Sequence, residues 1–382
     1  MFPPLAYIEW IEGRPTAADH DLGSSDLRPL PAGDPGDPVP PRLAGLEPPT
    51  TDRSLRASVA AEYDVDESQV LLTAGATHAD FLASAAAGGA ARERAGASDT
   101  GPHAIGDDDV PRPRALVERP GYEPLVKTPR GLGLQVARFL RPEPNATLDP
   151  DRIEAAASDL TGPLAHVTVT NRHNPTGRLT TRSTLEATAG VVDETGGYLL
   201  VDEVYAPYTS EDGAGAFGGP TAAGLPSTAV VGSLTKFQGL GGLRVGWVVG
   251  PEEFVDRARR VEEHVPALAR PSTALARRFF AHRDDLVADA RDHCRANHDL
   301  LSSFLDDRDD LSGTVDPGSP FGYLEHDRAD GDTVSEAAWD AGILVVPGRF
   351  FGMDNGVRVS LGRDPDACAA ALDAFGSVLD DL

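Results

Sequence analysis

Short apolar stretches alternate with amphipathic stretches along the chain as far as about residue 250. Apolar runs rich in β-branched side chains predict strands, and apolar residues at helical spacing predict the helices between them. The predicted strands span residues 70–73, 115–118, 135–140, 165–170, 198–201, 229–232 and 245–249. The predicted helices span residues 55–63, 78–87, 148–160 and 181–194.

This alternation predicts an α/β fold: a large domain whose mostly parallel central sheet is sandwiched by helices. Three of its strands are apolar throughout, which is typical of strands buried on both faces of a parallel sheet; they span 198–201, 229–232 and 245–249. From residue 252 a long helical stretch precedes short strands near 322–324, 343–346 and 357–361 and a closing helix over 366–379. That order predicts a smaller C-terminal α+β domain.

The chain is therefore expected to have three parts. These are an N-terminal arm at 1–45 that packs with the small domain, a large domain at 46–251 and a small domain at 252–382. The arm is rich in proline and glycine, which favours an extended conformation. Residues 88–113, with three consecutive aspartates at 107–109, are interpreted as a solvated surface insertion.

Charge and cysteine content exclude several classes of protein. The 34 basic and 60 acidic side chains give a net charge of −26, which repels nucleic-acid phosphates. The two cysteines lie far apart in the sequence and cannot form a disulfide framework or a cysteine-based zinc site. With no apolar run long enough to cross a membrane and no visible signal peptide, we expect a soluble cytoplasmic protein that binds neither membranes nor nucleic acid.

Lysine is almost absent from this chain. It occurs only at Lys127 and Lys236, and every other basic residue is arginine. Together with the excess of carboxylates and the 6% aromatic content, this composition is typical of proteins adapted to high salt. A sequence that avoids lysine in this way keeps one where arginine cannot serve, or by chance, and Lys127 is interpreted as a solvated residue without a role.

Polar groups follow the predicted strands at the point where each strand ends. Ligands of open α/β sheets bind beyond the carboxyl ends of the strands, so these groups are expected to meet in one crevice. In chain order they are Gly75-Ala76-Thr77, Pro120-Gly121-Tyr122, Asn174 within residues 171–177, Asp202 with Tyr205, and Ser233 with Lys236.

Several of these groups suit a phosphorylated ligand. The predicted helix start at Gly75-Ala76-Thr77 offers backbone N–H groups to a phosphate. The hydroxyl of Ser233 and the guanidinium of Arg244 add a donor and a bidentate cation. The lysine amine at position 236 is expected to have a lowered pKa in this crowded, arginine-flanked site, which would make it a nucleophile.

The remaining groups suit an aromatic ring with a basic nitrogen and a phenolic oxygen. Asp202 would pair with a protonated ring nitrogen, and Tyr122 offers a flat face for the ring. Asn174 and Tyr205 would hold the phenolic oxygen. Together with the phosphate site and the amine, these groups describe pyridoxal 5′-phosphate, a phosphorylated pyridine aldehyde.

The chain resembles the class I and II (fold type I) pyridoxal-phosphate-dependent aminotransferases, in order, from about Leu55 to Gly362. Its most specific stretch is Ser-Leu-Thr-Lys-Phe-Gln-Gly-Leu-Gly-Gly-Leu-Arg-Val-Gly-Trp at 233–247, which is similar to the family's Schiff-base lysine signature. Asn-Pro-Thr-Gly at 174–177 and Asp-Glu-Val-Tyr at 202–205 resemble two further family motifs. Arg358 occupies the place of the arginine that binds the substrate carboxylate.

The resemblance implies a role for each matching residue. Lys236, Asp202 and Tyr205 are expected to act in catalysis, with Lys236 covalently joined to the cofactor, and Arg358 and Asn174 are expected to bind substrate. The expected cofactor ligands are Gly75, Ala76, Thr77, Tyr122, Asn174, Asp202, Tyr205, Ser233, Lys236 and Arg244.

The activity implied is transfer of an amino group from an α-amino acid to a 2-oxo acid. Other pyridoxal-phosphate chemistry, such as decarboxylation or C–S cleavage, and a catalytically silent cofactor-binding sensor are the alternatives. The family also implies a homodimer. The chain departs from the family at 48–56, which lacks the tyrosine that reaches the partner's phosphate, and residues 22–25 are a candidate for the family's substrate-side loop.

Other readings of single motifs are weaker. His293, Cys294 and His298 are spaced poorly for zinc and are interpreted as a solvated helix face. The Gly-Leu-Gly at 239–241 begins like a dinucleotide-binding fingerprint, but an arginine takes the place of the third glycine.

Overall fold

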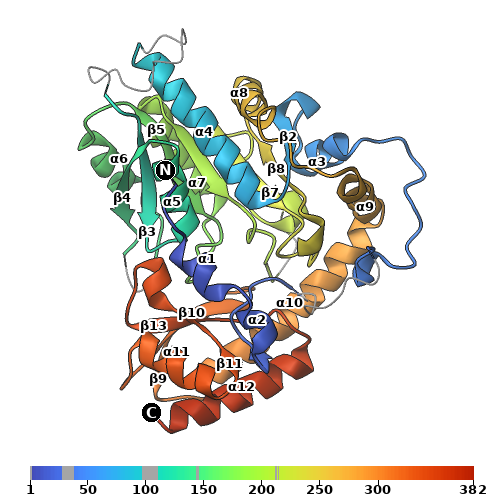
Figure 1. The fold of residues 1–382 in the computed structure, drawn as a ribbon, viewed down its shortest axis with the longest axis vertical. Helices are drawn as coiled ribbons and strands as arrows, with labels where there is room; N and C mark the ends of the chain where they lie inside the picture. The colour runs from blue at the N-terminus through green and yellow to red at the C-terminus, as the bar shows by residue number, and fades with distance from the viewer. Residues whose placement is uncertain (1, 28–37, 97–110, 143–145, 211–212, 214) are drawn as a thin grey trace.

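The computed structural model describes residues 2–27, 38–96, 111–142, 146–210, 213 and 215–382, and its large domain is built on a seven-stranded sheet (Figure 1). The strand order is β2-β8-β7-β6-β5-β3-β4. All neighbouring pairs are parallel except those that involve β8, which runs antiparallel to both β2 and β7. The strands are β2 Val70–Thr73, β3 Arg114–Arg119, β4 Gln135–Leu140, β5 Leu164–Thr170, β6 Tyr198–Asp202, β7 Thr228–Ser233 and β8 Gly246–Val249.

Helices cover both faces of this sheet. On one face pack α4 (Ala76–Arg94), α5 (Glu123–Gly131) and α8 (Glu252–Glu262), with a core rich in alanine. On the other face pack α3 (Leu55–Tyr63), α6 (Pro150–Ser158), α7 (Arg182–Glu194) and α9 (Arg270–Ala281). Successive strand residues point to opposite faces and both faces are apolar, which explains the continuous hydrophobic runs in the sequence.

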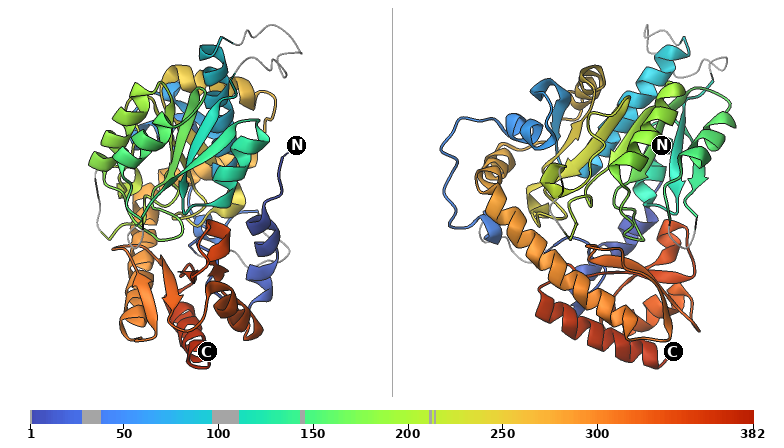
Figure 2. Two further views of the ribbon diagram at one scale, coloured as in Figure 1. Left: turned by 90° about the vertical axis from the view of Figure 1, so that its left-hand side faces the viewer. Right: turned by 180° about the vertical axis from the view of Figure 1, so that it is seen from behind.

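The small domain is built on a four-stranded antiparallel sheet of order β12-β13-β10-β9. A separate parallel pair joins β1 to β11, so the N-terminal segment lies against this domain (Figure 2). The strands are β1 His20–Asp21, β9 Leu311–Thr314, β10 Phe321–His326, β11 Ile343–Leu344, β12 Val346–Pro347 and β13 Gly356–Ser360. The helices are α1 Ala6–Ile11, α2 Arg14–Ala17, α10 Arg283–Asp306, α11 Gly331–Asp340 and α12 Pro365–Asp380.

Short 3₁₀ turns complete the connections, at Pro41–Leu43, Glu67–Gln69, Ala216–Gly218, Gly241–Leu243 and Gly348–Phe351. Among the described residues, no helix combines the length and the apolar character that crossing a lipid bilayer requires. The expected α/β fold with a smaller α+β domain is confirmed.

Three local expectations were wrong. Residues 88–94 continue α4, and their small side chains pack on the sheet; Leu134 lies so close to Gly88 that a Cβ there would approach it to 3.0 Å. Residues 97–110 of the expected insertion lie outside the described residues. The strand at 246–249, expected to be parallel, runs antiparallel to both of its neighbours. An apolar run is compatible with either direction, so the sequence pattern did not determine it. The arm contains two short helices and is not wholly extended.

Candidate active site

A cavity of about 240 Å³ lies at the carboxyl ends of β5, β6 and β7, where the small domain and the N-terminal segment meet the large sheet. It brings together all the expected site residues except Gly75, which lies just outside it. The lining residues are Tyr7, Ser25, Asp26, Ala76, Thr77, Asp80, Tyr122, Thr170, Asn174, Asp202, Val204, Tyr205, Ser233, Thr235, Lys236, Arg244 and Arg358.

One part of the cavity is arranged for an anion. Helix α4 begins at Ala76, so its first backbone N–H groups have no partner within the helix. Gly75 has φ 84°, and an added Cβ there would lie 2.7 Å from Nη2 of Arg244. The glycine therefore allows the guanidinium to lie against the helix N-terminus. The hydroxyls of Ser233 and Thr235 line the same cavity, and this set of donors suits a phosphate group.

Asp202 is the last residue of β6 and is buried. Its Oδ1 accepts a hydrogen bond from the backbone N–H of Val204 at 3.1 Å. Burial raises the pKa of the Asp202 carboxyl to about 6, while that hydrogen bond and the charge of Lys236 act in the opposite direction. A buried carboxylate of this kind is stabilised by a positively charged ligand group.

A second carboxyl, Asp80 on α4, lines the same cavity. Burial, together with the nearby Asp202, raises the pKa of Asp80 well above its ordinary value. The sequence analysis did not single out Asp80. An available signal was its position among Ala79, Leu82 and Ala83 on the apolar side of the helix.

Lys236 follows β7, and its amine meets a carboxylate that the sequence analysis did not find. Its Nζ lies 2.5 Å from Oδ1 of Asp26 and 3.4 Å from Oγ of Ser25. Burial alone would lower the pKa of the Lys236 amine, but Asp26, with Tyr205 and Tyr122, raises it above its ordinary value. The expectation of a lowered pKa was therefore wrong for this chain, because it neglected Asp26.

The segment 22–27, here called the strap, fixes Ser25 and Asp26 in this position. Its backbone is held on the small-domain side, where the N–H of Ser360 donates to the carbonyl of Leu22 at 2.9 Å. It is held on the large-domain side, where the N–H of Leu27 donates to the carbonyl of Lys236 at 3.1 Å. Oγ of Ser25 lies 2.7 Å from the hydroxyl of Tyr205. The candidate loop at 22–25 thus does reach the cavity.

Arg358, in the middle of β13, is 2% exposed and reaches the cavity from the small domain. Its Nη1 donates to Oδ1 of Asn174 at 2.9 Å, and its Nη2 donates to the carbonyl of Gly23 at 2.8 Å. Its Nε is buried and has no hydrogen-bond partner among the described residues. An arginine with an unused buried donor at a cavity wall is suited to bind a carboxylate.

Tyr122 lies at the N-terminus of α5, and burial raises its hydroxyl pKa above the ordinary value. Its ring packs edge-on against Tyr7, with ring centroids 5.8 Å apart. Tyr7 also approaches Arg358, whose Nη2 lies 3.4 Å from the Tyr7 hydroxyl. The helix α1, which carries Tyr7, gave no chemical signal in the sequence, so this residue was missed.

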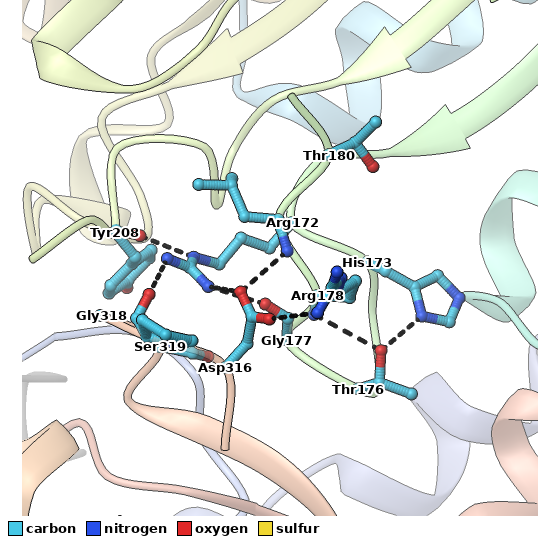
Figure 3. A network of polar contacts seen from close by, with 12 residues as sticks. Arg172, His173, Thr176, Gly177, Arg178, Thr180, Tyr208, Asp316, Gly318 and Ser319 are labelled. Atoms are coloured by element: carbon cyan, nitrogen blue, oxygen red, sulfur yellow. Dashed lines mark hydrogen bonds and ion pairs between the residues drawn. The ribbon is translucent and has the colours of Figure 1, made fainter. Parts of the chain in front are cut away.

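Buried polar contacts hold the loop that carries Asn174 (Figure 3). The guanidinium of Arg172 donates to the carbonyls of Tyr208, Gly177 and Pro317, and it pairs with Asp316 at 3.0 Å. Since Asp316 belongs to the segment between β9 and β10, this contact fixes the loop to the small domain.

A second buried pair lies beneath the same loop. Glu118 on β3 pairs with Arg141 at 2.8 Å and accepts from both the N–H and the hydroxyl of Thr170. The N–H of Asn174 in turn donates to Oγ1 of Thr170 at 3.1 Å. These fixed contacts restrict the orientation of the Asn174 amide.

The residues present fit pyridoxal phosphate. The cofactor requires an anion site, a partner for its ring nitrogen and a nucleophile, and these are the N-terminus of α4 beside Arg244, the buried carboxyl of Asp202 and the amine of Lys236. A carboxylate substrate requires a further donor, which is the unused Nε of Arg358. No cluster of metal-ligating side chains occurs among the residues that the structure describes. The expected solvated face at His293, Cys294 and His298 was wrong, because His293 and Cys294 are buried and Sγ of Cys294 donates to the carbonyl of Gly318.

Comparison with known proteins matches residues 43–375 to the family model "Aminotransferase class I and II". The chain is 26% identical to histidinol-phosphate aminotransferase of Halorubrum lacusprofundi, over 82% of this chain and 76% of that protein. It is 27% identical to aspartate/prephenate aminotransferase of Thermus thermophilus, over 68% of this chain and 66% of that protein. The fold superposes on aspartate aminotransferase from Thermus thermophilus with a TM-score of 0.74 and 22% identity, covering 99% and 97% of the two chains. A pyridoxal-phosphate-dependent aminotransferase from Streptococcus suis gives a TM-score of 0.76 at 20% identity, covering 100% and 98%.

Proposed function

The chain belongs to the class I and II aminotransferase family, whose cofactor is pyridoxal phosphate, and we propose that it transfers amino groups through the amine of Lys236. The observation that carries this proposal is the meeting of Lys236, Asp202, Arg244 and Arg358 around one cavity. Lys236 and Arg244 belong to one stretch of the chain, Asp202 and Arg358 come from two others, and each of the four supplies a group that the reaction requires.

In this proposal two arginines bind the anionic groups of the cofactor and of the substrate. Arg244, with the N-terminus of α4, binds the phosphate of the cofactor. Arg358 binds the carboxylate of the amino acid, using a guanidinium already oriented by Asn174 and Gly23. Because the Arg358 guanidinium is buried and already held by Asn174 and Gly23, substrate binding does not require it to lose much further freedom.

In this proposal four residues contact the aromatic ring of the cofactor. Asp202 holds the proton on the ring nitrogen, and its burial makes that ion pair strong. Tyr205 and Asn174 donate hydrogen bonds to the ring oxygen, and Tyr122 packs on the ring face. When bound, the cofactor supplies an electron-withdrawing ring that stabilises negative charge at the substrate Cα.

Lys236 moves the proton that the reaction requires. Its amine would hold the cofactor covalently, and once free it would be placed to take the proton from the substrate Cα as a general base. Ser25 and Asp26 lie within 3.4 Å and 2.5 Å of the amine and hold it at the wall of the cavity. An arginine could not serve at this position, because its charge is delocalised over a planar guanidinium that offers no nucleophilic amine.

The proposal is tested by a single half-reaction. The protein loaded with pyridoxal phosphate is mixed with one L-amino acid at a time in high salt, without any 2-oxo acid. We expect at least one amino acid to convert the cofactor to its amine form and release an equimolar 2-oxo acid. Release of CO₂ or of a thiol would instead identify a decarboxylase or a C–S lyase, and cofactor binding without any half-reaction would identify a silent sensor.

We further propose that the enzyme works in the cytoplasm as a salt-adapted homodimer. The two buried free cysteines support the cytoplasm, the net charge of −26 supports salt adaptation, and the family supports the homodimer. Light scattering in molar KCl should give twice the mass of the chain, and thermal unfolding should shift to higher temperature as KCl increases. A monomer, or a melting temperature independent of salt, would contradict the corresponding part.

A further inference from the structure

The cavity contains a carboxylate that neither the cofactor nor the substrate carboxylate requires. Asp26 lies on the strap with its side chain 28% exposed, and its Oδ1 is 2.5 Å from Nζ of Lys236. Within the described part of the chain, Lys236 is the only cation that Asp26 contacts. Asp26 therefore stands beside the nitrogen at which the reaction takes place.

The backbone on either side of Asp26 is held by contacts that do not involve the ion pair. The N–H of Leu27 donates to the carbonyl of Lys236 at 3.1 Å, directly after Asp26 in the chain. On the other side, the carbonyl of Ser25 accepts from the hydroxyl of Tyr208 at 3.0 Å. The carbonyl of Asp26 also packs so closely on Gly362 that a Cβ there would approach it to 2.0 Å. Movement of Lys236 toward the cofactor would leave the Asp26 carboxylate in place.

The cations that line the cavity are already assigned. Among the described residues of the wall, they are Lys236, Arg244 and Arg358. Lys236 bonds to the cofactor, Arg244 binds its phosphate and Arg358 binds the substrate carboxylate in the proposed function. No further described cation of this wall is available for a second substrate carboxylate. The polar groups that remain beside Lys236 are the hydroxyl of Ser25 and the carboxylate of Asp26.

On the basis of the proposed function, we infer that Asp26 selects the side chain of the amino donor. It favours amino acids whose side chain carries a positive charge or a hydrogen-bond donor, and it disfavours acidic amino acids. A carboxylate has about four lone-pair positions, and the Lys236 nitrogen uses one of them, so others remain for a substrate donor. An acidic side chain at the same place would meet a like charge in a partly desolvated site.

The test compares amino acids of equal size and different charge. The first pair is 2,4-diaminobutyrate, which is cationic, and norvaline, which is neutral. The second pair is aspartate, which is anionic, and asparagine, which is neutral. In their α-methyl forms these compounds lack the Cα hydrogen, so changes in the absorbance of the bound cofactor report binding alone. Dissociation constants are measured for the holoenzyme, for Asp26→Asn and for a surface control, Asp373→Asn, which lies exposed on α12.

We expect the parent and the Asp373→Asn control to bind the cationic compound at least tenfold more tightly than norvaline, and asparagine more tightly than aspartate. In Asp26→Asn both ratios should fall to within about threefold of unity. Retention of both ratios in Asp26→Asn, or tighter binding of aspartate than asparagine by the parent, would overturn the inference alone. If no amino acid gives a half-reaction, the proposed function fails, and the inference fails with it.

Discussion

Replacing Asp202 with asparagine tests the buried carboxylate that the proposed mechanism places at the ring nitrogen of the cofactor. The substitution keeps the size and shape of the side chain and an oxygen that can accept from the N–H of Val204. It removes the negative charge that holds a proton on the ring nitrogen of the cofactor. Because a neutral amide is easier to bury than a carboxylate, the variant protein without cofactor should unfold at the same or a higher temperature than the parent.

The magnitude follows from the burial of the site. Burial raises the pKa of Asp202 from 3.8 to about 6, and a difference of about two pH units corresponds to ~3 kcal/mol. That is roughly the free energy by which the site disfavours a carboxylate that has no cation beside it. Losing one partner of a buried ion pair costs about 3–5 kcal/mol, so we expect the half-reaction to slow by roughly 100- to 5000-fold.

The assay is the single-turnover half-reaction, followed by the absorbance of the bound cofactor under saturating amino acid. Measuring it at full cofactor occupancy separates the chemical effect from weaker cofactor binding. A matched control is Asp373→Asn, which removes a carboxylate from an exposed helix face. A rate for Asp202→Asn within threefold of the parent, with cofactor bound and the fold intact, would refute the reasoning.

Two further predictions concern Arg358 and Glu203. In Arg358→Lys a single ammonium cannot contact Asn174, Gly23 and a substrate carboxylate together, so the dissociation constant for amino acids should rise at least tenfold; an unchanged constant in spectral titration would contradict this. Burial raises the pKa of the Glu203 carboxyl to about 8, whereas in the unfolded chain this carboxyl loses its proton near pH 4.5. The folded chain therefore retains a proton that the unfolded chain has lost. The stability that this proton binding contributes is lost as the pH rises through 8. Denaturant unfolding is measured at pH 6 and pH 9 for the parent and for Glu203→Gln. Between these two pH values the variant should lose about 2 kcal/mol less stability than the parent. Parallel pH profiles of the two proteins would argue against a buried neutral acid at Glu203.

Much of the large domain could be predicted from the sequence, because its information is local. The strand at 70–73 and the helix at 55–63 were predicted with the bounds that the structure has. Asn174, Asp202 and Ser233 lie at or just beyond strand ends, and parallel strands bring such positions to one edge. This is why a sequence pattern could place them near one another before any coordinates were considered.

The other side of the cavity could not be predicted in the same way. Tyr7 and Asp26 come from a segment with no periodic pattern, and they reach the cavity through hydrogen bonds with β13 and with Lys236. The error about the pKa of Lys236 has the same origin. Burial and neighbouring arginines can be guessed from a sequence, whereas a carboxylate that lies 210 positions away in the chain cannot.

The most direct test of the central claim is to find where the cofactor is attached. The holoenzyme is reduced with borohydride, digested, and its peptides are analysed by mass spectrometry. The chain itself provides an internal comparison, because it contains only two lysines. The account predicts the pyridoxyl label on Lys236, and none on Lys127 or in Lys236→Ala. A label on Lys127, or persistent labelling of Lys236→Ala, would contradict it.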